Sequence, residues 1–175
     1  MKISAIILSA GNSTRYLSSK PKVFHELSGQ KLIDFNISLL NKYKEIKSCH
    51  IITNTALKEN FINLGYKNIS IQSPINGTGG AIAQFVSKNN IKADYYLICL
   101  GDTPIFNKKT IDALIKKTKN QKLDINVLGQ NLDNPFGYGR LIIENKNLKA
   151  IVEEKNCNIE EKKISTINTG IFLLS

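Results

Sequence analysis

One apolar run, Ile3 to Ser9, ends directly in a glycine turn. Such a run is typical of a strand buried on both faces, because helices cover both sides of a parallel sheet. Further apolar runs recur along the chain at residues 49–53, 69–72, 95–100 and 125–128. Segments with helical periodicity separate them, at residues 32–43, 56–64 and 78–87 and around Ile111, Leu114 and Ile115. In the segment 78–87 the apolar side is expected to consist of Ala81, Ile82, Phe85 and Val86. This alternation predicts an α/β fold with a doubly wound, mostly parallel sheet.

The rhythm changes after residue 130. A loop at residues 134–139 precedes an expected hairpin of residues 140–143 and 148–152, which turns around Asn145. One more strand is expected within residues 164–174, and the chain stops one residue later. We therefore expect one domain, residues 1–175, with parts 1–130 and 131–175 and a sheet that is incomplete at its C-terminus.

Charge and cysteine usage restrict the class of protein. The 175 residues carry a formal net charge of +10, but the lysines are scattered, and their tightest cluster, Lys116, Lys117, Lys119 and Lys122, has no interleaved aromatic residue. This pattern favours solvated helix faces over a nucleic-acid surface. The three cysteines have no metal-ligand spacing, which favours a reducing cytoplasm, and no apolar run approaches the length of a membrane span. We expect no nucleic-acid partner and no membrane.

The loop after the first strand has the character of a phosphate site. Gly11 permits a tight turn, after which backbone N–H groups of residues 11–14 can face a triphosphate. Arg15 and Lys22 add fixed positive charge. The loop lacks the glycines of a P-loop or a dinucleotide-binding fingerprint. The alternative is an ordinary polar turn between strand and helix.

A second glycine-rich segment spans residues 72–81. Gln72 offers a donor and an acceptor, which suits the hydrogen-bonding edge of a uracil. Gly77 and Gly79 let the backbone approach a planar ligand, and Thr78 is expected to cap the helix that follows. The alternative is a helix cap with flexible glycines.

The third motif, Gly101-Asp102, follows the run at residues 95–100. Ligands of α/β folds bind at the carboxyl ends of strands, and a carboxylate there can hold Mg²⁺ against phosphate oxygens. The alternative is an aspartate that caps a helix.

A fourth set lies in the strand-rich part. Gly139 permits close backbone contact, while Glu153 and Asn168 offer the carboxylate and amide that sugar hydroxyls and an N-acetyl group need. Each of these residues alone also fits a turn or a strand end. His25 and His50 have no carboxylate or cysteine arrangement around them, so both are expected to be structural.

Together these segments resemble a known family. Residues 10–15 and 21–29 resemble the opening of the nucleotide-sugar pyrophosphorylases, most closely the uridylyltransferase domain of bacterial bifunctional N-acetylglucosamine-1-phosphate uridylyltransferases. The resemblance covers essentially the whole chain. Ser9 replaces the usual Ala, Ser13 the usual Gly, and Gly80 a position often held by His.

The resemblance implies a set of roles. Arg15 and Lys22 are the implied catalytic residues, and Asp102 is the implied ligand of Mg²⁺. The implied nucleotide-binding residues are Ala10, Gly11, Lys22, Gln72, Gly77 and Thr78, and the implied sugar-binding residues are Gly139, Glu153 and Asn168. Residues 1–130 then form the nucleotide-binding part, and residues 131–175 begin the sugar-binding part.

The implied reaction joins UTP and N-acetylglucosamine 1-phosphate to give UDP-N-acetylglucosamine, a cell-wall precursor, and pyrophosphate. Three alternatives stay open at this point. The chain can be a molybdenum-cofactor guanylyltransferase, another sugar-phosphate nucleotidyltransferase, or a shortened nucleotide-binding remnant without catalysis. The family's second metal ligand and its acetyltransferase β-helix fall outside these 175 residues, and the sequence predicts no oligomeric state.

Overall fold

The computed structural model describes residues 1–11, 18, 20–105 and 107–175. In this part of the chain, eight strands form one mixed sheet in the order β5-β4-β1-β6-β10-β8-β9, and β7 pairs with β10 beside that path. The strands are β1 (Ile3–Ser9), β4 (Ile46–Thr53), β5 (Ile69–Ile71), β6 (Tyr95–Leu100), β7 (Ile125–Asn131), β8 (Arg140–Glu144), β9 (Asn147–Val152) and β10 (Thr166–Leu174). The predicted α/β class is confirmed.

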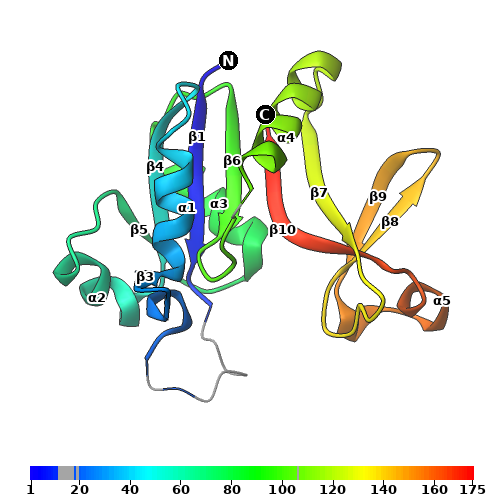
Figure 1. The fold of residues 1–175 in the computed structure, drawn as a ribbon, viewed down its shortest axis with the longest axis horizontal. Coiled ribbons are helices and arrows are strands. Elements are labelled where there is room, and N and C mark those ends of the chain that lie inside the picture. Colours follow the sequence, from blue (N-terminus) through cyan, green and yellow to red (C-terminus); the bar gives the residue numbers. More distant parts are fainter. Residues whose placement is uncertain (12–17, 19, 106) are drawn as a thin grey trace.

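The first half of the sheet is parallel. Strand β1 pairs in parallel with β4 and with β6, and β4 pairs in parallel with β5. The carboxyl ends of these strands therefore meet at one edge of the sheet, which lies at the bottom of Figure 1. Strand β10 enters antiparallel to β6, β7 and β8.

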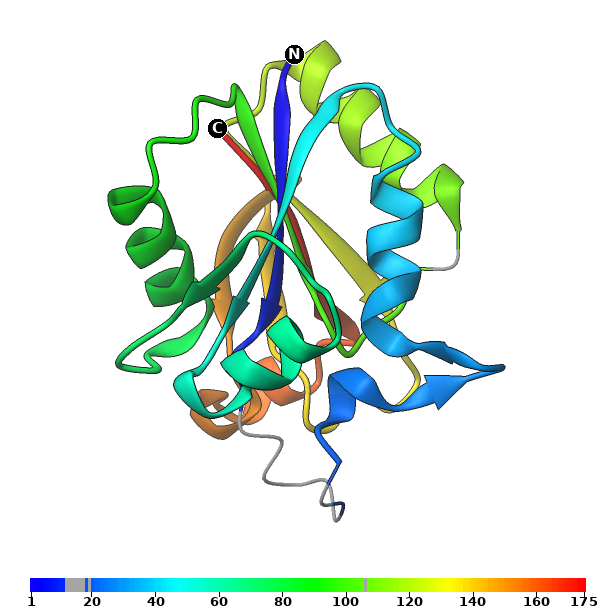
Figure 2. The same cartoon turned by 90° about the vertical axis from the view of Figure 1, so that its left-hand side faces the viewer.

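Helices cover both faces of the parallel strands. They are α1 (Leu32–Leu40), α2 (Lys58–Asn63), α3 (Gly77–Lys88), α4 (Lys108–Gln121) and the short α5 (Ile159–Lys162). Figure 2 shows α1 and α4 on one side of the sheet and α3 on the other. Successive side chains of β1 point to opposite faces of the sheet, so they pack in two hydrophobic cores. Ile7 packs in the core that contains α1 and α4, whereas Ile6 packs with Phe85 of α3.

Two expectations about the helices are wrong in detail. Thr78 does not cap α3, because Gly77 at φ +85° starts the helix one residue earlier and Asn76 occupies the cap position without a side-chain cap bond. Val86, expected on the apolar side of α3, is 43% exposed. The helix turns it away from the sheet, while Ala81 and Phe85 face the sheet.

The strand-rich part continues the same sheet and extends to one side of the parallel strands (Figure 1). Strands β8 and β9 pair as the predicted hairpin, and Asn145 and Lys146 both adopt positive φ at its turn. Three short elements near the first loop were not predicted: a 3-10 turn at Lys22–Phe24, labelled η1, and the paired strands β2 (Glu26–Leu27) and β3 (Gln30–Lys31). No helix in the described residues is long and apolar enough to cross a membrane.

Candidate active site

The predicted lysine and the predicted metal ligand lie in contact. Lys22 Nζ is 3.0 Å from Asp102 Oδ2, and both side chains are about one-third exposed at the carboxyl edge of the sheet, 38% and 32%. Eighty residues separate them in sequence. The structure therefore places a cation and a carboxylate together where parallel strands present ligand sites.

The first loop is described only at its start. Asn54 Nδ2 donates to the carbonyl of Ala10 at 3.0 Å, which fixes the exit of β1 against the end of β4. Gly11 is exposed at the same edge. Arg15 and Ser13 lie outside the described residues, so their roles stay predictions.

The backbone beside Asp102 has no room for a side chain. A Cβ on Gly101 would lie 2.2 Å from Ser9 Oγ and 3.3 Å from Val23 Cγ1. Ser9 Oγ is itself buried and has no hydrogen-bond partner within the described residues. Gly101 therefore lets β1 and the Asp102 loop approach each other closely.

The residues present suit Mg²⁺ that arrives with a nucleotide. Asp102 offers one carboxylate, and no group of three or more His, Cys, Asp or Glu side chains in the described residues could hold a metal ion. Magnesium commonly takes one or two carboxylates and completes its shell with waters and substrate phosphates. The Asp102 carboxylate is partly exposed, so it can take part in such a shell.

The glycine-rich segment holds Gln72 tightly. Gln72 is 4% exposed, and its Nε2 donates to Asn76 Oδ1 and to the carbonyl of Gly77, both at 3.0 Å. The amide donors that were expected to read a base are thus bonded within the loop. Asn76 also fills the space next to Gly80, where a Cβ would lie 1.8 Å from Asn76 Oδ1. The glycine at position 80 accommodates this asparagine.

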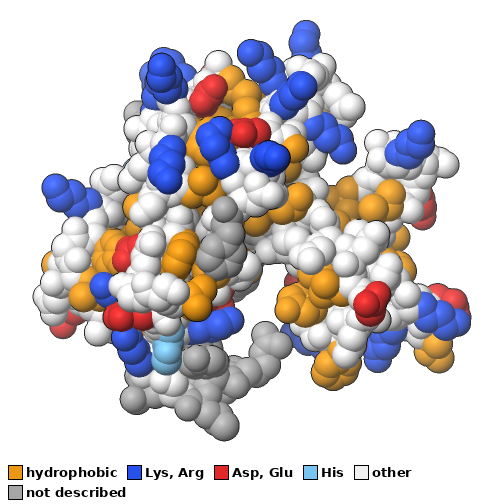
Figure 3. Space-filling model, viewed as in Figure 1, with side chains coloured by type: hydrophobic (Ala, Val, Ile, Leu, Met, Phe, Trp, Pro, Cys, Tyr) orange, Lys and Arg blue, Asp and Glu red, His pale blue; other side chains and the backbone are white. Residues whose placement is uncertain are grey.

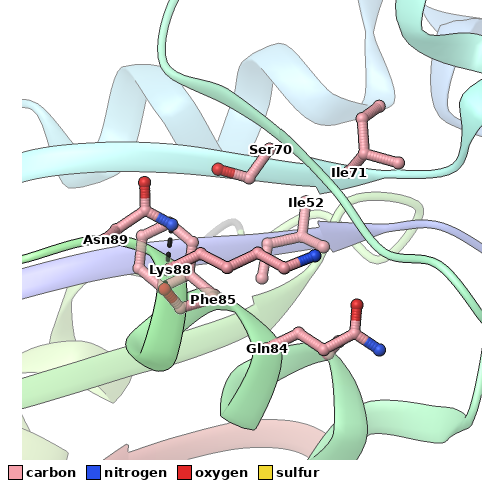
Figure 4. Close-up of a pocket in the computed structure, with 8 residues that line it drawn as sticks. Ile52, Ser70, Ile71, Gln84, Phe85, Lys88 and Asn89 are labelled. Carbon is pink, nitrogen blue, oxygen red and sulfur yellow. Dashed lines mark hydrogen bonds between the residues drawn. The ribbon is translucent and has the colours of Figure 1, made fainter.

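Sequence reasoning missed a residue that shapes this segment. Gln84 of α3 accepts from the backbone N–H of Ser73 at 3.1 Å and donates to the carbonyl of Pro74 at 3.2 Å. It also lines a cavity of about 270 Å³ between α3 and the strands β4 and β5 (Figure 4). Near this cavity the ring of His50 lies 5.1 Å from that of Phe85, and burial lowers the pKa of His50. A neutral histidine packed on an aromatic ring fits the expected structural role.

Strand register brings the three predicted sugar-binding residues into one row. Arg140 of β8 pairs with Val152 of β9 and with Ile167 of β10. The flanking residues Gly139, Glu153 and Asn168 are therefore neighbours. Asn168 N donates to the Gly139 carbonyl at 2.8 Å, and a Cβ on Gly139 would lie 3.3 Å from Glu153 Oε1.

An ion pair between a buried arginine and a partly exposed glutamate lies next to this row. Arg140 is 1% exposed, and its Nη2 lies 2.7 Å from Glu154 Oε2. Arg140 Nη1 donates to the Tyr138 carbonyl, and Glu154 Oε2 also accepts from Gly137 N at 3.3 Å. The pair therefore ties the loop before β8 to the turn after β9. No pattern in the sequence indicates that this arginine is buried.

Lysines that are scattered in sequence gather in space. Figure 3 shows Lys and Arg side chains over the end of the molecule where β1 begins. A groove of about 470 Å³ there is lined by Lys42, Lys44, Lys108, Lys116 and Lys119, with Glu45 and Asp112 among them. Lys108 is paired with Asp112 at 2.7 Å. The fold therefore brings Lys42 and Lys44 beside Lys116 and Lys119, which belong to the tightest lysine cluster of the sequence.

A family model described as the MobA-like NTP transferase domain matches residues 5–154. The chain belongs to this family. The match spans β1, the Lys22–Asp102 contact and the glycine-rich segment, and it ends at Glu154.

Curated relatives point to one branch of the family. The chain is 35% identical over 176 residues to the bifunctional protein GlmU of Alkaliphilus metalliredigens, and 34% identical over 177 residues to that of Fervidobacterium nodosum. These alignments take in 98% and 99% of this chain but 38% and 37% of the relatives. The chain thus spans less than two-fifths of the length of these proteins.

Solved structures confirm the fold. A Bacillus anthracis structure assigned as a glucose-1-phosphate thymidylyltransferase matches with a TM-score of 0.80 at 23% identity, over 99% of this chain and 71% of that one. The inositol-1-phosphate CTP transferase of T. maritima matches with a TM-score of 0.71 at 16% identity, over 98% and 70%. At these identities the likeness concerns architecture alone.

Proposed function

We propose that the chain is a nucleotidyltransferase that makes UDP-N-acetylglucosamine and pyrophosphate from UTP and N-acetylglucosamine 1-phosphate. One observation carries the proposal: Lys22 and Asp102 meet at the carboxyl edge of the parallel strands, and β10, which pairs with β6 of those strands, also carries Asn168 of the row with Gly139 and Glu153. Resemblance to uridylyltransferase domains supplies the identity of the two substrates.

The proposed reaction needs positioning more than acid–base chemistry. A phosphate oxygen of the acceptor attacks the α-phosphorus of UTP in line, and the bond to the β-phosphate oxygen breaks as pyrophosphate leaves. A phosphate monoester is already ionised at neutral pH, so no general base is required. Bound with the nucleotide at Asp102, Mg²⁺ would neutralise phosphate charge. Lys22 holds a positive charge beside the same oxygens and stabilises the leaving group.

The sugar row has the chemistry that the acceptor requires. Glu153 accepts from hydroxyl groups, and the Asn168 amide can donate to an acetyl carbonyl. Gly139 leaves the approach open, because a side chain there would press on the Glu153 carboxylate.

The test is magnesium-dependent release of pyrophosphate from UTP and N-acetylglucosamine 1-phosphate, with GTP, CTP and dTTP assayed in parallel. Lys22→Ala and Asp102→Ala should each lower turnover by about 100-fold or more, the usual effect of removing one electrostatic group from such a site. Lys20→Ala is the matched lysine control, because Lys20 pairs loosely with Glu26 at 3.6 Å on the surface. Turnover of the Lys20 variant should stay within about twofold of the parent, since surface pairs contribute little.

Two other functions remain as outcomes of the same assay. The MobA-like description of the family favours a different nucleotide or acceptor, and a preference for GTP or CTP would select that function. The other function is that of a nucleotide-binding protein without catalysis. Tight UTP binding without turnover would select that function.

A further inference from the structure

An asparagine on α1 is enclosed behind the Asp102 loop. Asn36 is 0% exposed, and within the described residues its side chain bonds to the backbone at the end of β6 and in that loop. Its Nδ2 donates to the carbonyl of Leu100 at 2.8 Å and to that of Thr103 at 3.1 Å. Its Oδ1 accepts from Ile105 N at 2.7 Å. The side chain therefore bonds on both sides of Asp102.

These bonds fix the geometry of a short irregular segment. Residues 101–104 follow the end of β6 and belong to no helix or strand, so the sheet ladder does not hold them. Two carbonyls and one N–H converge on a single amide, which satisfies both of its donors and one acceptor position. A fully satisfied buried polar cluster specifies one arrangement of the backbone that it joins. Here that backbone carries the Asp102 carboxylate.

The helix that carries Asn36 also sets the position of the lysine. Leu32 N, at the start of α1, donates to the His25 carbonyl at 2.9 Å, directly after the Lys22–Phe24 turn. Phe24 is buried in the same core as Ile33 of α1. Helix α1 is therefore anchored to the lysine segment at its first residue and to the aspartate loop through Asn36.

We propose that Asn36 is a positioning residue that aims the Asp102 carboxylate, opposite Lys22, at the metal ion of the bound nucleotide. This inference rests on the function proposed above. Asn36 touches no substrate and acts through the loop. Groups that orient a metal ligand from behind contribute about 10–100-fold to metal affinity.

The chain contains a matched control for loss of a buried asparagine. Asn126 of β7 is 7% exposed, and its Nδ2 donates to the Leu114 carbonyl at 3.3 Å and to Thr118 Oγ1 at 3.0 Å. Those partners belong to α4, and none of them is a predicted site residue. Replacement of Asn126 damages the core to a comparable degree without touching the Asp102 loop.

The experiment measures the gain in nucleotide affinity that the metal provides. Calorimetry gives the Kd of UTP with Mg²⁺ and again with EDTA, for the parent chain, Asn36→Ala, Asn126→Ala and Asp102→Ala. The ratio of the two Kd values removes general damage to the site, because such damage weakens both. We expect Asp102→Ala to abolish the gain, Asn36→Ala to reduce it about tenfold, and Asn126→Ala to change it less than about twofold. Asn36→Ser serves the same purpose if the alanine variant does not fold.

The outcomes separate the two proposals. If the gain depends on Asp102 but is the same in Asn36→Ala as in the parent, the positioning role is refuted and the metal site stands. An equal loss in the Asn36 and Asn126 variants would also refute it, because the effect would then be structural. If the parent chain shows no metal-dependent gain, the metal role of Asp102 fails and the inference fails with it.

Discussion

Glu154→Gln should lower the free energy of unfolding by more than is usual for a partly exposed glutamate. The glutamate is 21% exposed, but it is the only carboxylate that pairs with Arg140 in the described residues, and that guanidinium is 1% exposed. Glutamine keeps the volume and one acceptor oxygen while it removes the charge. The arginine would remain charged and buried without a counter-ion, because a guanidinium does not deprotonate in proteins.

The magnitude follows from the burial. Removing one partner of a buried ion pair typically costs 3–5 kcal/mol, and the partial exposure of Glu154 together with the retained acceptor places this case at the lower end, about 3 kcal/mol. For a protein of this size, such a loss lowers Tm by about 6–12 °C. Gly137 N also loses part of its acceptor, so the loop before Gly139 should become more mobile.

Urea unfolding and thermal unfolding, each followed by circular dichroism, measure the effect. Glu160→Gln is the control, because the Lys163–Glu160 pair has the same N–O distance, 2.7 Å, but side chains that are 65% and 78% exposed. That substitution should change stability by well under about 1 kcal/mol. Equal and small losses in both variants would refute the argument that burial of Arg140 makes the pair costly to break.

Three further predictions concern buried groups. Ser9→Ala should raise the free energy of unfolding by about 1 kcal/mol, since it removes a buried hydroxyl that has no hydrogen-bond partner within the described residues. Ser4→Ala, which breaks a 2.9 Å bond to Ser48, should lower it by a similar amount in the same urea titration. Gly101→Ala should lower the free energy of unfolding by about 2 kcal/mol, because its Cβ would overpack against Ser9 Oγ. The double variant with Ser9→Ala should recover most of this loss, because the next atom, Val23 Cγ1, is 3.3 Å from that Cβ. Strictly additive effects of the two substitutions would contradict the clash. Burial raises the pKa of Cys49 to about 11, so its stabilising contribution is complete below the pKa of the unfolded thiol, near 9, and is lost as the pH rises toward 11. Cys49→Ala should therefore flatten the decline in unfolding free energy between about pH 9 and 11 by up to about 3 kcal/mol, and an unchanged slope would contradict the assigned burial.

Much of the fold was predictable because the local hydrophobic patterns agree with the order of strands and helices that an α/β sheet requires. Apolar runs marked the strands of the parallel half, and the glycines that follow β1 and β6, Gly11 and Gly101, marked the edge where ligands bind. Lys22 and Asp102 were assigned to the site separately, and their contact at that edge is a finding of the structure. The row of Gly139, Glu153 and Asn168 followed from motif order, and the strand register supplied the reason for it.

The supporting residues could not be predicted from single positions. In the sequence, an asparagine of an amphipathic helix that faces water cannot be distinguished from one that bonds to a distant loop. Asn36 is of the second kind, because it bonds to a residue 64 positions away. Arg140 directly follows the glycine-rich loop of residues 134–139, where an exposed side chain is expected. It is buried because β8 pairs with β10, and this pairing is visible only in the structure. Thr78 was assigned as a cap from its residue type, but the positive φ of Gly77 decided where the helix begins.

Strand β10 has a consequence for how the chain folds during synthesis. It pairs with the flank of β6, about 70 residues earlier in sequence, and Leu173 of β10 is fully enclosed against that strand. Until β10 has left the ribosome, β6 presents an unpaired hydrophobic edge, a template for association with other chains. Contacts of such long range also close slowly. Chaperone demand for this protein should therefore peak in the interval between emergence of Leu100 and emergence of Leu174, which stalled nascent chains of graded length can measure.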